Sequence, residues 1–140
     1  MFVNQIAVFL ENRTGRINEF AACLASAGIN IIAMSIADTT DYGILRVITD
    51  DNTKAMEVLT ANGFNCASTY LVGFEVDDVP GSMQRVLDIL TKYEVNIGYL
   101  YSFVRAMEKK AIILIKVDNN EKVAEILKAN GIKLIERPIL

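Results

Sequence analysis

Residues 11–31 read ENRTGRINEFAACLASAGINI, and residues 77–97 read DDVPGSMQRVLDILTKYEVNI. The two stretches align at an offset of 66, which matches Gly15 with Gly81 and places an Asn-Ile pair at the end of both. A repeat of this length is too long for a solenoid unit and long enough for a small domain. The chain is therefore predicted to hold two similar domains in tandem.

The predicted domains cover residues 1–69 and 70–140. An Asn-Gly pair recurs at residues 62–63 and 130–131, which extends the match to the later part of each repeat. A core of about 70 residues is only marginally stable alone. No segment rich in Pro, Gly or Ser separates the halves, so we expect the two domains to be closely coupled.

Apolar periodicity gives each repeat the order strand, helix, strand, strand, helix, strand. In the first repeat these elements are a strand over 5–10, a helix from about 17 that ends before Gly28, strands over 31–37 and 42–49 around a turn at 39–41, a helix that ends at 62–63, and a strand over 64–69. In the second they are a strand over 71–76, a helix with an apolar stripe over 83–90, strands over 97–103 and 111–117, a helix that ends at 130–131, and an edge strand over 134–139 that contains Pro138. Asp50-Asp51-Asn52 offers N-cap oxygens to the second helix, and Asp118-x-x-Glu121 resembles a capping box at the fourth.

This order predicts an α+β fold, with two ferredoxin-like βαββαβ units in tandem. The second strand of such a unit lies at a sheet edge, and here both second strands are apolar. An exposed apolar edge invites pairing with other chains unless it is covered. We therefore expect the repeats to pair into one wide antiparallel sheet with the helices on one face.

Composition excludes several classes of function. The net charge is −3, whereas a nucleic-acid-binding protein usually has a basic face, and the third strands lack the stacking aromatics of an RNA-binding module. No apolar run is long enough to span a membrane. The first residues, MFVN, do not resemble a signal peptide, so we expect a cytoplasmic protein. Hydrophobic residues make up 52% of the chain, which favours subunit contacts and a homodimer.

The residue types also argue against an enzyme. The chain has no histidine, no Gly-x-Gly-x-x-Gly and no phosphate-binding Gly-x-x-x-x-Gly-Lys motif. We therefore expect neither catalysis nor a cofactor or metal, although an enzyme that uses only Asp, Glu, Lys and Tyr stays an alternative. Cys23 is expected to pack as a small hydrophobic group. Cys66 falls in a predicted strand, and no disulfide is expected in the cytosol.

The repeated segments resemble the ACT domain, a small regulatory module that binds amino acids. The resemblance rests on ENRTGR at 11–16 before a helix and AGINI at 27–31 after it, repeated as DDVPGS at 77–82 and EVNI at 94–97. It covers nearly the whole chain as two tandem copies, so we expect a stand-alone pair of such domains. The second copy departs from the pattern because Glu94-Val95 replaces Gly-Ile and its loop has no arginine.

In the ACT family the ligand sits between domains, against the glycine loop and the second strand. For the first repeat this implies the residues Asn12, Arg13, Thr14, Gly15, Arg16, Asn30 and Ile31. For the second repeat it implies the residues Asp78, Val79, Pro80, Gly81, Ser82, Asn96 and Ile97. A helix N-terminus that follows a glycine turn suits a carboxylate, and Asn12, Asp77, Asp78 or strand carbonyls could accept bonds from the ammonium.

These residues also have structural interpretations. The glycines could only permit the turns, Asn12 or Thr14 could cap the helix, and the side chains of Asn30 and Asn96 could bond to backbone. Arg13 and Arg16 could be solvated, which we favour for Arg16. Asp77 and Asp78 could form a metal pair, but solvated loop acids are favoured.

The second strand of the second repeat is unusually aromatic. Ile97, Tyr99, Tyr101 and Phe103 alternate along it and are expected to share one face. This face is either ordinary core or a surface that packs in a dimer or lines a ligand pocket.

The sequence therefore favours a regulatory protein that senses a free amino acid at the interface between ACT-like domains. The expected partners are that amino acid, a second copy of the chain, and a metabolic enzyme or regulator. The alternative is a structural or protein-interaction module that binds no ligand and modulates a metabolic enzyme.

Overall fold

The computed structural model describes residues 2–38 and 41–136, which form two compact units. The N-terminal unit is Asn4–Thr69, and the C-terminal unit runs from Tyr70 and also includes Val3 from the start of the chain. Within the described ranges, none of the helices combines the length and apolarity needed to cross a membrane.

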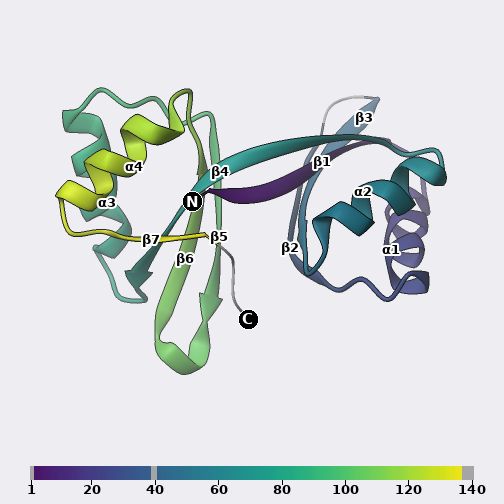
Figure 1. The fold of residues 1–140 in the computed structure, drawn as a ribbon, viewed down its shortest axis with the longest axis horizontal. Coiled ribbons are helices and arrows are strands. Elements are labelled where there is room, and N and C mark those ends of the chain that lie inside the picture. The colour runs from purple at the N-terminus through teal and green to yellow at the C-terminus, as the bar shows by residue number, and fades with distance from the viewer. Residues whose placement is uncertain (1, 39–40, 137–140) are drawn as a thin grey trace. The chain divides into compact units, whose positions relative to one another are not determined.

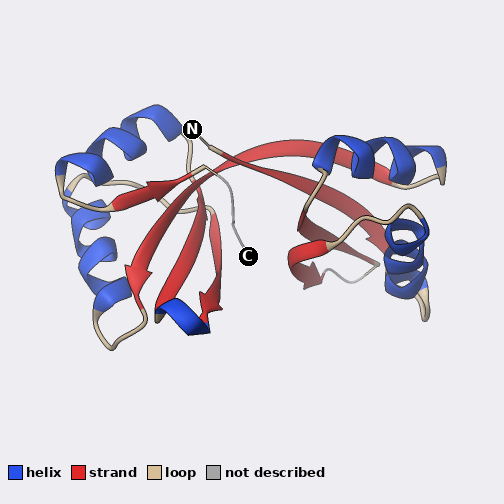
Figure 2. Ribbon diagram, turned by 60° about the horizontal axis from the view of Figure 1, so that its bottom comes forward, coloured by secondary structure: helices blue, strands red, loops and turns tan. Residues whose placement is uncertain are grey.

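The predicted βαββαβ order is confirmed in both units (Figure 1, Figure 2). The N-terminal unit holds β1 (Val3–Glu11), α1 (Arg16–Ser26), β2 (Ile31–Asp38), β3 (Tyr42–Thr49), α2 (Asn52–Ala61) and the start of β4 (Asn65–Asp77). The C-terminal unit holds the rest of β4, α3 (Ser82–Lys92), β5 (Tyr99–Arg105), a 3-10 turn (Ala106–Glu108), β6 (Lys110–Lys116), α4 (Asn120–Ala129) and β7 (Lys133–Ile135).

The strands form an antiparallel sheet, as predicted. Their order is β2-β3-β1-β4-β6-β5, and β7 also pairs with β4. The repeats are joined through β4, a single 13-residue strand where the sequence predicted two shorter ones. The second strands of the repeats, β2 and β5, stand at the two ends of this order.

Each unit buries the face of its strands that its helices cover. In the N-terminal unit the register pairs Ile6 with Val47 and Val8 with Leu45, which places these side chains on one face. Figure 1 shows α1 and α2 on this face, where Phe20 and Leu24 of α1 complete the core. The C-terminal unit repeats the plan with a separate core. Its members are Val72, Phe74, Val86, Leu90, Ile113, Ile115, Val117, Val123, Leu127 and Ile132.

The starts of α2 and α4 test two of the predicted helix caps. The Asp51 side chain accepts a hydrogen bond from the Lys54 N–H and caps α2, as predicted. At α4, however, the cap is Asn119, which accepts from the Lys122 N–H at 3.1 Å. The capping box predicted at Asp118 is wrong by one residue, because asparagine caps a helix as well as aspartate does.

Two predicted elements extend into parts of the chain that lie outside the described residues. The turn at 39–41 includes residues 39–40, and the last strand was predicted to include Pro138. The described portion of that last strand is β7, Lys133–Ile135.

The predicted aromatic face needs one correction. Tyr99, Tyr101 and Phe103 pair with Lys116, Leu114 and Ile112, on the face of the sheet away from the helices. Ile97 instead packs against the helix-side core. Regular strand begins only at Tyr99, so the alternation that would place Ile97 with the aromatic residues does not extend back to it.

Gly73 on β4 provides a test of packing in the C-terminal unit. A Cβ atom at this position would lie 2.7 Å from Cγ1 of Ile135 and 2.9 Å from Cγ2 of Val3. Overpacking of this kind costs about 1–3 kcal/mol. We expect Gly73→Ala to lower the free energy of unfolding by that amount in urea denaturation.

Gly98→Ala is the matched control, because the nearest atom to its Cβ is the Lys116 carbonyl oxygen at 3.5 Å, an ordinary contact. Its effect should stay within about 0.5 kcal/mol. Equal effects at both glycines would contradict the close packing around Gly73.

Candidate functional site

The loop between β1 and α1 is held in one shape by its backbone. The Asn12 N–H donates to the Asp41 carbonyl at 2.9 Å, and the Arg16 N–H donates to the Arg13 carbonyl at 3.3 Å. Gly15 stands at the N-cap of α1 with φ of 88°, in the left-handed region that favours glycine. The turn role predicted for Gly15 is confirmed.

The N-cap residue of α1 provides no side-chain cap. The N-cap residue is Gly15, and it makes no side-chain cap bond, so the expectation that Asn12 or Thr14 caps this helix is wrong. The first N–H groups of a helix lack partners within the helix, and they carry the positive end of its dipole. This helix start is therefore suited to a negatively charged group.

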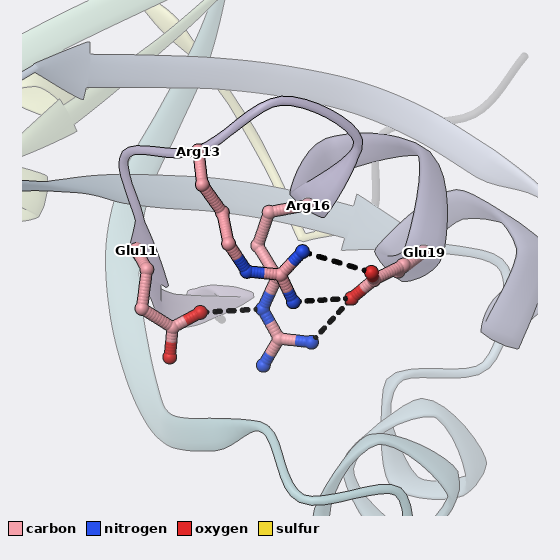
Figure 3. A network of polar contacts seen from close by, with 4 residues as sticks. All are labelled: Glu11, Arg13, Arg16 and Glu19. Carbon is pink, nitrogen blue, oxygen red and sulfur yellow. Dashed lines mark hydrogen bonds and ion pairs between the residues drawn. The ribbon is translucent and has the colours of Figure 1, made fainter.

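Beside this helix start, two arginines converge on one carboxylate (Figure 3). Arg13 makes two parallel bonds to Glu19, at 3.0 and 2.9 Å. Nη1 of Arg16 donates to the same carboxylate at 2.8 Å. Nε of Arg16 lies 2.7 Å from a carboxylate oxygen of Glu11 as an ion pair, without hydrogen-bond geometry.

Arg16 is not solvated, contrary to our expectation. Its side chain is only 13% exposed, and its guanidinium lies 4.1 Å from the centre of the Phe64 ring. A cation is attracted to the face of an aromatic ring, and this attraction holds the Arg16 guanidinium against Phe64. Arg16, Glu19 and Phe64 line an open cavity of about 520 Å³ between α1 and α2.

The network shifts the ionisation of its members. The hydrogen bonds from Arg13 and Arg16 lower the pKa of Glu19 from 4.5 to about 2. The same bond to Glu19 raises the pKa of Arg13. The Arg13–Glu19 pair is therefore ionised and engaged within the N-terminal unit at neutral pH.

The loop between β4 and α3 repeats the backbone of the first loop. The Asp78 N–H donates to the Lys109 carbonyl at 2.9 Å, and Gly81 is the N-cap of α3 with φ of 88°. The side chains differ, because Val79, Pro80 and Ser82 replace Arg13, Thr14 and Arg16. Asp77 forms an ion pair with Lys110, which raises the pKa of Lys110.

The structure separates the rest of the predicted site from these loops. Ile31 pairs with Thr49 at one end of β3, whereas Glu11 pairs with Tyr42 at the other end. Eight residues of strand place these ends about 23 Å apart. Within one unit, the glycine loop and the start of the second strand therefore lie at opposite ends of the sheet.

The two asparagines have different surroundings from those expected. The Asn30 N–H donates to the Asp50 carboxylate at 3.0 Å, and the Asn30 carbonyl accepts from the Asp50 N–H at 3.0 Å. Asn30 is thus held through its backbone. Asn96 lines a small cavity of about 170 Å³ with Asn119 and Lys122.

Sequence reasoning missed Glu11 and Glu19 as members of the first site. The available signal was the spacing of Arg16 and Glu19, because residues three apart on a helix are neighbours. The contact between Arg16 and Phe64 joins residues 48 positions apart in the chain, and no local pattern indicates it.

Neither metal binding nor thiol chemistry is indicated at these sites. Across residues 2–38 and 41–136, no three His, Cys, Asp or Glu side chains are grouped so that they could hold a metal ion. Cys23 and Cys66 pack against the N-terminal core. Burial raises the pKa of both thiols, which disfavours the reactive thiolate.

Comparison with known proteins identifies the family. The model of the ACT domain pair matches residues 1–139, so the chain belongs to the ACT domain pair family, as the resemblance predicted. The protein BT0572 from Bacteroides thetaiotaomicron has a similar structure, with a TM-score of 0.90 and 38% identity over 96% of this chain and 92% of that one.

A more distant likeness shows the fold alone. The ligand-free regulatory subunit of aspartate kinase from Thermus thermophilus has a TM-score of 0.66 and 15% identity, over 91% of this chain and 90% of that one. The corresponding subunit from Thermus flavus has a TM-score of 0.65 and 14% identity, over the same shares. None of the curated proteins compared with this chain matches it.

The charge network predicts a pH dependence of stability. Because the pKa of Glu19 falls from 4.5 to about 2 on folding, its ion pairs stabilise the protein above pH 4.5 and cease to do so as the pH falls toward 2. We expect Glu19→Gln to lower the melting temperature by a few degrees at pH 7. The difference from wild type should shrink as the pH falls from about 5 to 2.

Glu57→Gln is the control, because Glu57 is an exposed helical glutamate of the same unit with no ion pair among the described residues. It should melt like wild type at every pH. A deficit of Glu19→Gln that stays constant with pH would mean that the lost stability is not electrostatic. Differential scanning calorimetry measures both.

Proposed function

We propose that this protein is a regulatory sensor that binds a free amino acid at the Gly15 loop, at an interface between ACT-like domains. The observation that carries the proposal is the start of α1, where the N-cap residue is a left-handed glycine without a side chain. Its N–H groups suit the ligand carboxylate. Asn12 and backbone carbonyls of the loop are proposed to accept bonds from the ammonium, and this pairing selects a zwitterion over a simple anion.

The charge network would take part in binding. Arg13 is 51% exposed and reaches Glu19 from the loop, not from the helix. A ligand carboxylate at the helix start would compete with Glu19 for this guanidinium. In the absence of ligand, the Glu19 carboxylate would thus bind Arg13 in place of the ligand carboxylate.

A second copy of the chain would complete the site. Asn30 and Ile31 lie at the end of the sheet opposite the Gly15 loop of the same unit. If β2 pairs antiparallel with an edge strand of another copy, the two sheets run in opposite directions. The loop end of one sheet then lies beside the Asn30–Ile31 end of the other, which brings one copy's Gly15 loop close to the other copy's second strand. Met34 and Ile36 of β2 are each 47% exposed, which supports a homodimer through this edge.

Such a site would couple the ligand to assembly. An amino acid held by two copies favours the dimer over the monomer, and a metabolic enzyme or regulator could bind one state preferentially. Membership of the ACT domain pair family supports a regulatory role. The proposal assigns the chain no catalysis of its own.

The alternative, an interaction module that binds no ligand, has one observation in its favour. Tyr99, Tyr101 and Phe103 share the helix-free face of the C-terminal unit with Ile112 and Leu114. Aromatic residues on such a face suit a protein contact.

The proposal predicts ligand-dependent stability and a role for Gly15. Thermal unfolding should be measured with each common amino acid at millimolar concentration. A ligand at 100 times its Kd stabilises by about 2.7 kcal/mol, so one or two amino acids should raise the melting temperature by about 5–10 °C. Gly15→Ala should abolish this rise, because the added Cβ would stand where the ligand approaches the backbone.

Gly63→Ala is the matched control. Gly63 also has a positive φ, 84°, and open space around its missing Cβ, so both variants carry a similar backbone strain of about 1–2 kcal/mol. Gly63 ends α2 and is not part of the Gly15 loop, so its variant should keep the full ligand response. No shift with any amino acid would retire the sensor proposal in favour of the interaction module.

The helix-free face predicts a change in mass in solution. If the alternative holds and this face forms a dimer, Tyr101→Asp should convert that dimer toward monomer in light scattering, because a buried unpaired charge opposes association. Tyr93→Asp is the control, since Tyr93 is 44% exposed at the end of α3. A Tyr101→Asp protein that remains dimeric would exclude this face from the dimer.

A further inference from the structure

The C-terminal unit has a cavity of about 300 Å³ in which cationic side chains gather. Three of them line it, Arg85 from α3, Lys110 from β6 and Lys133 from β7. Two carboxylates, Glu75 and Asp77 of β4, also line it. The lining therefore carries one positive charge more than it carries negative charges.

The ion pairs among these side chains leave one cationic side chain of the cavity without a partner in the described part of the chain. Asp77 is paired with Lys110. Glu75 lies 3.8 Å from Nζ of Lys133 and 3.6 Å from Nη1 of Arg105, a residue that does not line the cavity. The Arg85 side chain has no hydrogen-bond or ion-pair partner among the described residues. Glu75 is thus compensated twice, and the guanidinium of Arg85 is the group without a counter-charge.

In the N-terminal unit, the residues that correspond to Ser82 and Arg85 form an ion pair with each other. At the repeat offset of 66, Arg85 corresponds to Glu19 and Ser82 corresponds to Arg16. In the N-terminal unit, Arg16 stacks on Phe64 and binds Glu19. In the C-terminal unit, a short serine replaces the arginine that covers the cavity, and an arginine replaces the carboxylate.

From these observations we infer that this cavity binds a small oxyanion, a carboxylate or a phosphate, through Arg85 and the Ser82 hydroxyl. The planar guanidinium matches two oxygens of such an anion at once. Lys133 is 73% exposed and adds positive charge at the same cavity. The carboxylate of Asp77 disfavours a highly charged polyanion, and the volume admits only a small molecule. The inference does not depend on the amino-acid site.

The test is a titration of the full chain followed by amide NMR, at pH 7 and constant ionic strength. The probes are inorganic phosphate, acetate and glycine, with sodium chloride as the balancing salt. We expect saturable shifts at the amides of Ser82, Arg85 and Lys133 with phosphate or acetate. The one that binds more tightly identifies the source of the oxyanion.

Arg85→Gln should weaken that binding at least tenfold, and Arg85→Glu should abolish it. Lys92→Gln is the matched control, since it removes a cation from the last turn of α3, at the far end of the helix from Ser82, and should leave the affinity unchanged. Loss with Arg13→Gln alone would place the anion at the Gly15 loop and overturn the inference. Shifts that grow linearly with either salt, or that are equal in Arg85→Gln and wild type, would also overturn it.

Failure of this inference can be told apart from failure of the proposed function. Glycine and the other amino acids report on the Gly15 loop through thermal shifts that Gly15→Ala removes. The anion reports on the cavity through shifts that Arg85→Gln removes. The amino-acid response can therefore be absent while the anion response is present, and the reverse can also occur.

Discussion

Strand β4 must serve two hydrophobic cores with one continuous backbone. Its second half contributes Val72 and Phe74 to the core under α3 and α4, while its first half belongs to the N-terminal unit. Successive side chains of a strand point to opposite faces of the sheet, so position 73 faces away from the core to which Val72 and Phe74 belong. No room is left there for a side chain, because side chains of Val3 and Ile135 occupy the space of the missing Cβ of Gly73. A chain with no linker between repeats is stable here because the connection is itself part of the sheet.

The two repeats keep the backbone of the glycine loop and change its charges. Gly15 and Gly81 have the same φ of 88° at the same N-cap position, and both loops bond to the following hairpin. Around this common frame, one loop is surrounded by Arg13, Arg16 and Glu19. The other has no arginine in the loop and has Arg85 on the helix. The same turn therefore carries different charges in the two repeats, and this difference is the basis for proposing a separate site in each.

The sequence was sufficient for the fold because the fold depends on local and periodic signals. Apolar alternation, the glycine and Asn-Gly helix ends and the repeat itself predicted the order of elements in both units. It was insufficient where two choices were chemically equivalent, as at Asp118 and Asn119, either of which can cap α4. It also failed at Ile97, where the alternation of the strand does not extend back past Tyr99.

The candidate site was harder to predict, because its charges are set by contacts between distant residues. Arg16 looks like a solvated helix residue in the sequence, and only Phe64, brought close by the fold, makes it a stacked and paired one. The family pattern named Asn30 and the Gly15 loop together, although one unit holds them at opposite ends of β3. The residues named by the family pattern therefore do not come together within a single unit. In this chain, the residues that the two repeats share set the backbone of the glycine loop, and the residues in which they differ set its charges.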